Sequence, residues 1–216
     1  GSGASYPVFT IGGSAFLKPW FDAYRAMTPD GSLLLSAGDS EGATPPISNF
    51  FGDTPTVDLM NRMGFSADGL GNHNFDKGEA YLRTTLIPLA NFPFLTANII
   101  NPDGSFPAEW RPWKVFQFPG LRLGLVGFSN TDIAELTFPG SLGDFKVTDA
   151  LEAINREARQ LKRTGVDVVV AMGHEGATAG TISSPTGPAV DIADGTTQVD
   201  VVIGDHPDFQ ALAFRP

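Results

Sequence analysis

Four short apolar runs, each followed by a polar side chain that can bind a metal ion, constrain the fold of this sequence most strongly. Each run contains Leu or β-branched residues and then a glycine, a pattern typical of a buried strand that ends in a sharp turn. The runs are 33–38 before Asp39, 66–71 before Asn72 and His73, 168–173 before His174, and 201–204 before Asp205 and His206. The sequence has three histidines, and all three lie at these ends. Ligands of open α/β sheets gather beyond the carboxyl ends of parallel strands, so we expect these side chains to converge.

The converging set would consist of one carboxylate, one carboxamide oxygen and two imidazoles: Asp39, Asn72, His174 and His206. Mixed nitrogen and oxygen ligands suit Mn²⁺, Zn²⁺, Fe or Co²⁺ better than Ca²⁺ or a metal that prefers thiolates. A single histidine is more often a hydrogen-bonded, half-buried residue, and a Gly-Asp pair is also ordinary turn chemistry. Because every histidine follows a glycine-containing strand end, the pattern favours one shared metal site.

Strands alternate with helices along the rest of the chain, and this predicts an α/β layered domain with a mostly parallel sheet and antiparallel additions. The first five residues read as a linker or cloning scar, and 6–216 as one domain. Expected strands are 6–10, 33–36, 66–71, 94–99, 167–171 and 199–203, with a hairpin of 113–118 and 121–128. One helix is expected to begin near Ser14, and others are expected at 53–64, 78–89 and 149–165. The remaining stretches, 40–49, 101–112, 129–147 and 176–198, are expected to be mostly loop.

Length and charge exclude several classes of function. A chain of 216 residues can bury a substantial core. A formal charge of -10 without clustered Lys and Arg argues against binding to nucleic-acid polymers, and an anionic substrate would need a local cation. No apolar run approaches the ~20 residues of a membrane span, and no signal peptide is visible. The absence of cysteine excludes disulfides and thiolate ligands.

The four strand-end motifs, in this order, resemble the metal-site motifs of the calcineurin-like metallophosphoesterases. The subgroup they resemble most is the secreted bacterial 5′-nucleotidase and 2′,3′-cyclic phosphodiesterase family. The stretches 43–48, 71–78 and 92–98 also resemble that subgroup, and the likeness runs from about Ile11 to His206. The resemblance implies a layered α/β/β/α sandwich and an extracellular or periplasmic location.

The resemblance also implies a two-metal centre that hydrolyses phosphate esters such as nucleotides. Asp39 would bridge both metals, and Asn72, His174 and His206 would complete the shell of the second. Asn72 and His73 would contact the substrate, with His73 stabilising the transition state or protonating the leaving group. Two cations clamp the phosphoryl oxygens and lower the pKa of a bridging water, which attacks in line.

Three positions depart from the family pattern. No Asp-x-His motif precedes Ile11, Asp208 stands where the family has the final histidine of Gly-His-x-His, and Asn74 replaces a usual Glu. The first two departures concern the same metal, so we expect either one ion or two, with Asp208 a candidate oxygen ligand. The chain also stops where the family continues into a domain that grips the nucleobase, so the fold is expected to be incomplete at both ends.

Three readings of function follow from these observations. The first is a phosphoesterase of 5′-nucleotidase type, the second is a non-catalytic metal-binding or structural relative, and the third is a sulfur-ester hydrolase with similar motifs. Near the motifs, Glu175 either orients His174 or is a solvated turn residue, and Asp76 and Asp205 are expected to cap loops. Trp110 and Trp113 are expected to anchor a surface loop rather than form a ligand platform.

Overall fold

The computed structural model describes residues 13–207 and 209–214, in two compact units, 1–32 and 33–216. Helix α1 (Ser14–Ala26) lies in the first unit. The helix begins at the predicted Ser14, with Gly13 as its N-cap, and Pro19 lies inside it. The strand predicted for 6–10 lies outside the described residues.

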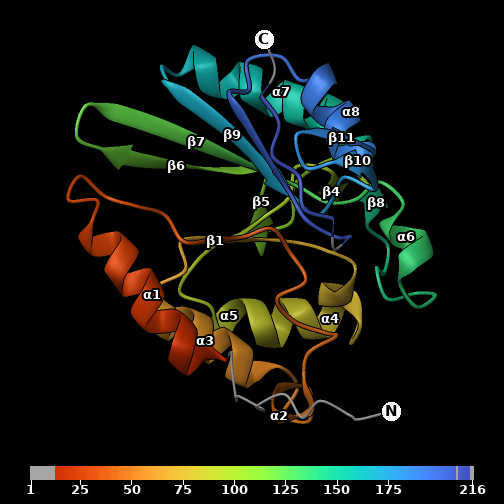
Figure 1. Cartoon of the computed structure of the whole chain (residues 1–216). Helices are drawn as coiled ribbons and strands as arrows, with labels where there is room; N and C mark the ends of the chain where they lie inside the picture. Colours follow the sequence, from red (N-terminus) through yellow and green to blue (C-terminus); the bar gives the residue numbers. More distant parts are fainter. Residues whose placement is uncertain (1–12, 208, 215–216) are drawn as a thin grey trace, which may run out of the picture. The chain divides into compact units, whose positions relative to one another are not determined.

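The second unit contains two four-stranded sheets, which Figure 1 shows. The first sheet is parallel and has the order β1 (Leu35–Ser36), β2 (Ala67–Gly69), β3 (Phe94–Leu95) and β5 (Trp110–Arg111). The second has the order β12 (Val201–Gly204), β9 (Val168–Gly173), β7 (Leu121–Phe128) and β6 (Trp113–Phe118). Its first three strands are parallel, and β6 pairs antiparallel with β7 through the predicted hairpin. The parallel strands therefore end at a common edge of each sheet.

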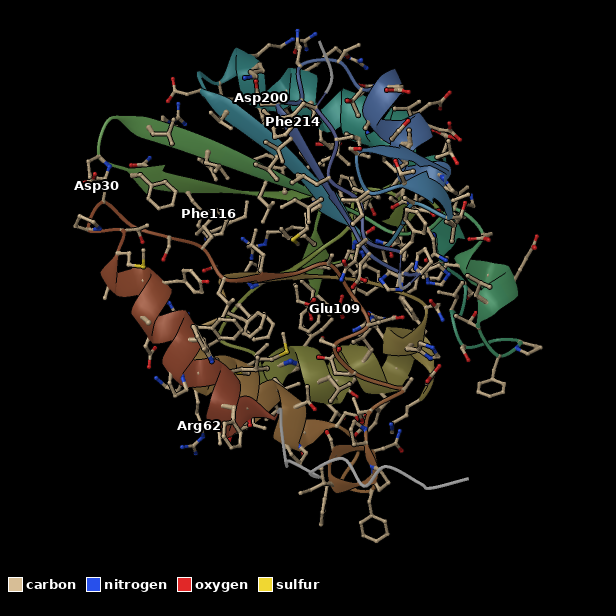
Figure 2. The ribbon with its side chains drawn as sticks, in the orientation of Figure 1. Asp30, Arg62, Glu109, Phe116, Asp200 and Phe214 are labelled. Carbon is tan, nitrogen blue, oxygen red and sulfur yellow. The ribbon has the colours of Figure 1, made fainter. Side chains whose placement is uncertain are left out.

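Helices cover the outer face of each sheet, and apolar side chains fill the three interfaces. Two helical segments lie against the first sheet: α3 (Thr54–Met63), and the continuous segment made of α4 (Glu79–Tyr81), a π-helical turn (Leu82–Leu86) and α5 (Ile87–Leu89). Helix α7 (Ala150–Arg163) lies against the second sheet (Figure 1). Between the sheets, Leu95 packs with Leu125 and Met172, and Phe116 of β6 joins this cluster (Figure 2). The predicted layered α/β/β/α sandwich is confirmed.

The two long helices of this unit begin and end where the sequence predicts. Helix α3 starts after Asp53 and ends at Gly64, whose φ of 76° gives the left-handed C-cap that glycine adopts at little cost. The Asp149 carboxylate accepts a hydrogen bond from the Glu152 backbone N–H at 2.7 Å and caps α7. Both helices bury one apolar face against a sheet.

The predicted loops contain more regular structure than the sequence indicates. They include α2 (Pro46–Asn49), α6 (Ile133–Leu136), β8 (Lys146–Val147), the hairpin of β10 (Ala179–Thr181) and β11 (Ser184–Thr186), and α8 (Pro188–Gly195). The strand predicted for 94–99 is divided into β3 and β4 (Ile99–Ile100), which pairs with β8. Apart from α8, which has eight residues, these elements are too short for a periodic signal, and tertiary contacts decide them.

The excursion 101–112 is anchored by its tryptophan and by an ion pair. Trp110 is buried, and its Nε1–H donates to the Ile99 carbonyl at 3.0 Å. Glu109 lies between the first sheet and the helices beneath it and binds Arg83 at 2.8 Å (Figure 2). Trp113 is half-buried in strand β6 and donates to Glu157 of α7 at 3.0 Å, so it links the second sheet to its helix rather than anchoring the loop. Within the described residues, no helix has the length and apolar character needed to cross a membrane.

Candidate metal centre

Three strand ends bring one carboxylate and two imidazoles together. Asp39 follows β1, His174 follows β9 directly, and His206 follows β12. Asp39 has a φ of 54° and His206 a φ of 91°, left-handed values that are uncommon for residues other than glycine. Backbone strain of this kind concentrates at functional sites, where the surrounding structure holds it in place.

The three side chains point ligand atoms at one another. His174 Nε2 lies 2.7 Å from Asp39 Oδ2 and 3.0 Å from His206 Nδ1. One ligand atom from each residue falls within a group in which no two are more than 4.8 Å apart. His174 is 2% exposed, whereas His206 lies at the surface, so the group is reached from one side. The convergence expected from the sequence is therefore present for these three residues.

Asn72, the fourth predicted ligand, is buried, and it directly follows Gly71, whose backbone packs closely against the ring of His174. A Cβ atom at position 71 would lie only 2.6 Å from His174 Cδ2, so a side chain has no room there. Asn72 is 5% exposed, and its Oδ1 has no hydrogen-bond partner among the described residues. A buried acceptor without a partner is costly, and a cation would satisfy it. The donor chemistry and this unpartnered oxygen both fit a divalent transition metal.

His73 lies beside the group and is oriented by a carboxylate. Its backbone N–H donates to Asp39 Oδ1 at 2.8 Å, and its Nδ1 lies 2.9 Å from Asp76 Oδ2. The side chain is 40% exposed, so solvent or a ligand can reach the ring. Asp76 was expected only to cap a loop. The spacing of three residues within a helical turn, here the 3₁₀ turn His73–Phe75, is the signal that could have predicted this pair.

Beneath these ligands, Asn74 connects two of the strand-end loops. Its Oδ1 accepts hydrogen bonds from the backbone N–H of Asp39 at 3.0 Å and of Gly71 at 2.7 Å. Its Nδ2 donates to Glu41, which is completely buried. Sequence reasoning treated Asn74 only as a departure from a family pattern and did not single out Glu41. No local pattern could have found this pair, because the two residues are 33 positions apart.

Two buried carboxyl groups near Asn74 hold protons at higher pH than usual. Burial, together with the nearby charge of Asp68, raises the pKa of Glu41 to about 8. Burial likewise raises the pKa of Asp68 to about 7, although hydrogen bonds from Ser40, Ser36 and two backbone amides oppose the shift. The electrostatic cause is the loss of water around the charged form.

The pKa of Asp53 is shifted in the opposite direction, because the Lys77 ammonium lies next to its carboxylate. Burial would raise its pKa, but hydrogen bonds from Lys77 and Thr44 outweigh burial and hold the pKa below the usual range. Lys77 Nζ lies 2.6 Å from the Asp53 carboxylate. This ion pair links the N-cap of α3 to the segment after His73.

Two described residues near the motifs, Glu175 and Asp205, do not join the group. Glu175 Oε1 accepts a hydrogen bond from the Thr131 backbone N–H at 3.3 Å, so it fixes a neighbouring loop rather than the ring of His174. Burial raises the pKa of Glu175. Asp205 is exposed, and Asp208 lies outside the described residues.

Comparison with known proteins finds relatives of this chain among the 5′-nucleotidases. No family model matches the chain. Over 178 residues it is 35% identical to a snake venom 5′-nucleotidase of Gloydius brevicauda, which covers 81% of the chain. The chain is homologous to the 5′-nucleotidases. The match spans 28% of that relative's length, so the chain corresponds to less than a third of it.

Solved structures agree with this relationship to the 5′-nucleotidases. A 5′-nucleotidase precursor from Thermus thermophilus superimposes with a TM-score of 0.75 and 25% identity, covering 91% of this chain and 36% of that one. The calcineurin-like phosphoesterase YfkN from Bacillus subtilis gives a TM-score of 0.71 and 26% identity, covering 87% and 61%. The metallophosphoesterase fold and the resemblance read from the strand-end motifs are thus confirmed.

Proposed function

We propose that this chain carries the phosphoesterase centre of a 5′-nucleotidase-type enzyme that hydrolyses nucleotides with the help of divalent cations. The observation that carries this proposal is the meeting of Asp39, His174 and His206 at the ends of three strands. Asn72 would add the carboxamide oxygen, and Asp208 remains a candidate for a further ion. The ligand chemistry favours Mn, Zn, Fe or Co, in one or two sites.

A bound cation supplies Lewis-acid polarisation of the phosphoryl group and lowers the pKa of a bound water. Asp39 is prepared for its role as a ligand, because His73 N–H and His174 each contact one of its oxygens. Asp76 fixes the ring of His73 by accepting from Nδ1, and Nε2 of the doubly protonated imidazolium would donate to a phosphoryl oxygen or to the leaving group. Asn72 and His73 would thus contact the substrate.

The substrate class follows from charge and from homology. A protein of charge -10 repels anions, so cations at the strand ends would supply the local attraction that a phosphate ester needs. A nucleotide is the substrate we propose, because the homologous proteins are named as 5′-nucleotidases. We also propose an extracellular or periplasmic location, and base recognition by a C-terminal domain outside this chain.

The experiment measures bound metal per chain and then hydrolysis with Mn²⁺ of AMP, a generic phosphodiester and a thiosulfonate. Asp39→Asn should remove metal and turnover together, because it removes an anionic ligand. The matched control is Asp58→Asn, an exposed carboxylate on α3 that binds Arg62, and it should behave as the wild type. Metal binding without turnover would instead support a non-catalytic relative, and turnover of the thiosulfonate alone would support a sulfur-ester hydrolase.

A further inference from the structure

The side-chain amide of Asn74 holds two of the loops that form the candidate metal centre. Its single oxygen accepts from the N–H of Asp39 on the loop after β1 and from the N–H of Gly71 on the loop after β2. Asp39 is a proposed ligand, and Gly71 directly precedes another, Asn72. A rotation of this amide by 180° would place its NH₂ group against both N–H donors. The orientation of one buried amide therefore matters to two ligands.

The acceptor that selects this orientation is Glu41. Asn74 is 3% exposed and Glu41 is 0% exposed, and Asn74 Nδ2 donates to Glu41 Oε2. An amide oxygen and an amide nitrogen are nearly the same size, so packing alone does not distinguish the two orientations. A carboxylate oxygen on the NH₂ side does distinguish them, because it accepts hydrogen bonds and does not donate them when ionised. Glu41 also accepts when protonated, through its second lone-pair site.

We propose that Glu41 is a positioning residue of the metal centre and acts through Asn74. Glu41 touches none of the three clustered ligand atoms; it fixes the amide, and the amide fixes the backbone of Asp39 and Gly71. This inference rests on the proposed function, since it names what holds two proposed ligands in place. Asn74 Nδ2 donates to one oxygen of Glu41, and the other oxygen has no hydrogen-bond partner within the distance criteria among the residues described.

The first test uses NMR on the metal-free full chain and measures hydrogen exchange of the Asp39 and Gly71 amides. Glu41→Ala should speed exchange at both amides by about tenfold or more relative to core amides such as that of Val170, because Asn74 can then rotate. The matched control is Glu157→Ala, which removes another buried glutamate but one that contacts Trp113 and Arg156. The control should leave the ratio of site exchange to core exchange unchanged.

A second substitution provides rescue and guards against simple misfolding. In Glu41→Ala with Asn74→Asp, the carboxylate at position 74 has two equivalent acceptor oxygens and needs no orienting partner. The double variant should recover amide protection to within about threefold of the wild type. Equal protection in the wild type and Glu41→Ala, or no rescue by Asp at position 74, would overturn the proposal.

Calorimetry with Mn²⁺ alone separates this proposal from the proposed function. Glu41→Ala should bind Mn²⁺ about 10- to 100-fold more weakly, the usual effect of losing a group that supports a ligand, and the double variant should regain affinity. Wild type that binds Mn²⁺ together with a Glu41→Ala variant that binds equally well would overturn only the role of Glu41. Wild type that binds no Mn²⁺ would overturn the metal centre itself, and with it the role of Glu41 there.

Discussion

Replacing Asp68 by Asn should stabilise the protein above neutral pH and remove part of its pH dependence. Asp68 lies in β2 with its side chain fully buried, and the Ser40 hydroxyl donates to its Oδ2. Ser36 and the backbone N–H groups of Gly38 and Gly69 also lie close enough to act on the carboxyl group and oppose the effect of burial. Burial raises the pKa of Asp68 from 3.8 to about 7, so the folded protein retains a proton that the unfolded chain releases.

The sign and size of the effect follow from this difference in pKa. A raised pKa gives stability that is complete below pH 3.8 and is lost as pH rises through about 7. A shift of about three pKa units corresponds to about 4 kcal/mol of unfolding free energy, lost between pH 4 and 7. Asn cannot ionise, but its NH₂ group needs an acceptor and costs about 1–3 kcal/mol without one. The net gain at pH 8 should therefore be about 1–3 kcal/mol, with no gain at pH 4.

Urea unfolding followed by tryptophan fluorescence, from pH 4 to 8 with EDTA present, measures this difference. Asp58→Asn is the control, because that carboxylate is exposed and its removal should leave the pH slope unchanged. A residual slope toward pH 8 is expected from Glu41, whose pKa of about 8 has the same sign of effect. The reasoning is refuted if the variant keeps the full slope of the wild type, or if it is less stable at every pH.

Two other carboxylates lead to predictions of different kinds. Asp53→Asn should lower the free energy of unfolding by about 2–4 kcal/mol at pH 7, because it leaves the Lys77 ammonium without its carboxylate. Because the pKa of Asp53 is lowered in the folded protein, this contribution to stability is present above pH 3.8 and is lost as the pH falls below that value. Urea unfolding should therefore give a small difference in stability between variant and wild type at pH 3 and a large difference at pH 7. Asp76→Asn should lower kcat for AMP by about 10- to 100-fold while Mn²⁺ affinity stays the same, because it frees the ring of His73, which is not among the proposed metal ligands. Steady-state kinetics with calorimetry test this, and a loss of Mn²⁺ affinity equal to the loss of kcat would contradict it.

The long helices and the buried strands were predictable because their signals are local. In α7, Asp149 supplies the cap and the apolar stripe of Ile154, Ala158 and Leu161 supplies the buried face, all within one stretch of sequence. The hairpin of β6 and β7 was equally clear, since a Pro-Gly pair separates two strand-like runs. The short elements inside the predicted loops were missed, because α2, α6 and β8 have four residues or fewer.

The layered architecture and the identity of the candidate ligands were determined by the sequence itself. Glycine-ended apolar runs specify parallel strands, and parallel strands place whatever follows them at an edge of their sheet, which is why Asp39, His174 and His206 could be named in advance. Asp39 follows a strand of the first sheet and the two histidines follow strands of the second, so only the packing of the two sheets brings the three together. Only the tertiary structure decided what supports those ligands. Glu41 and Asn74 come from different loops, and the folded layers alone bring them together in a place without water. The hydrogen bond from Asn74 to Glu41 and the raised pKa of Glu41 both depend on burial, and burial cannot be read from any single stretch of the sequence.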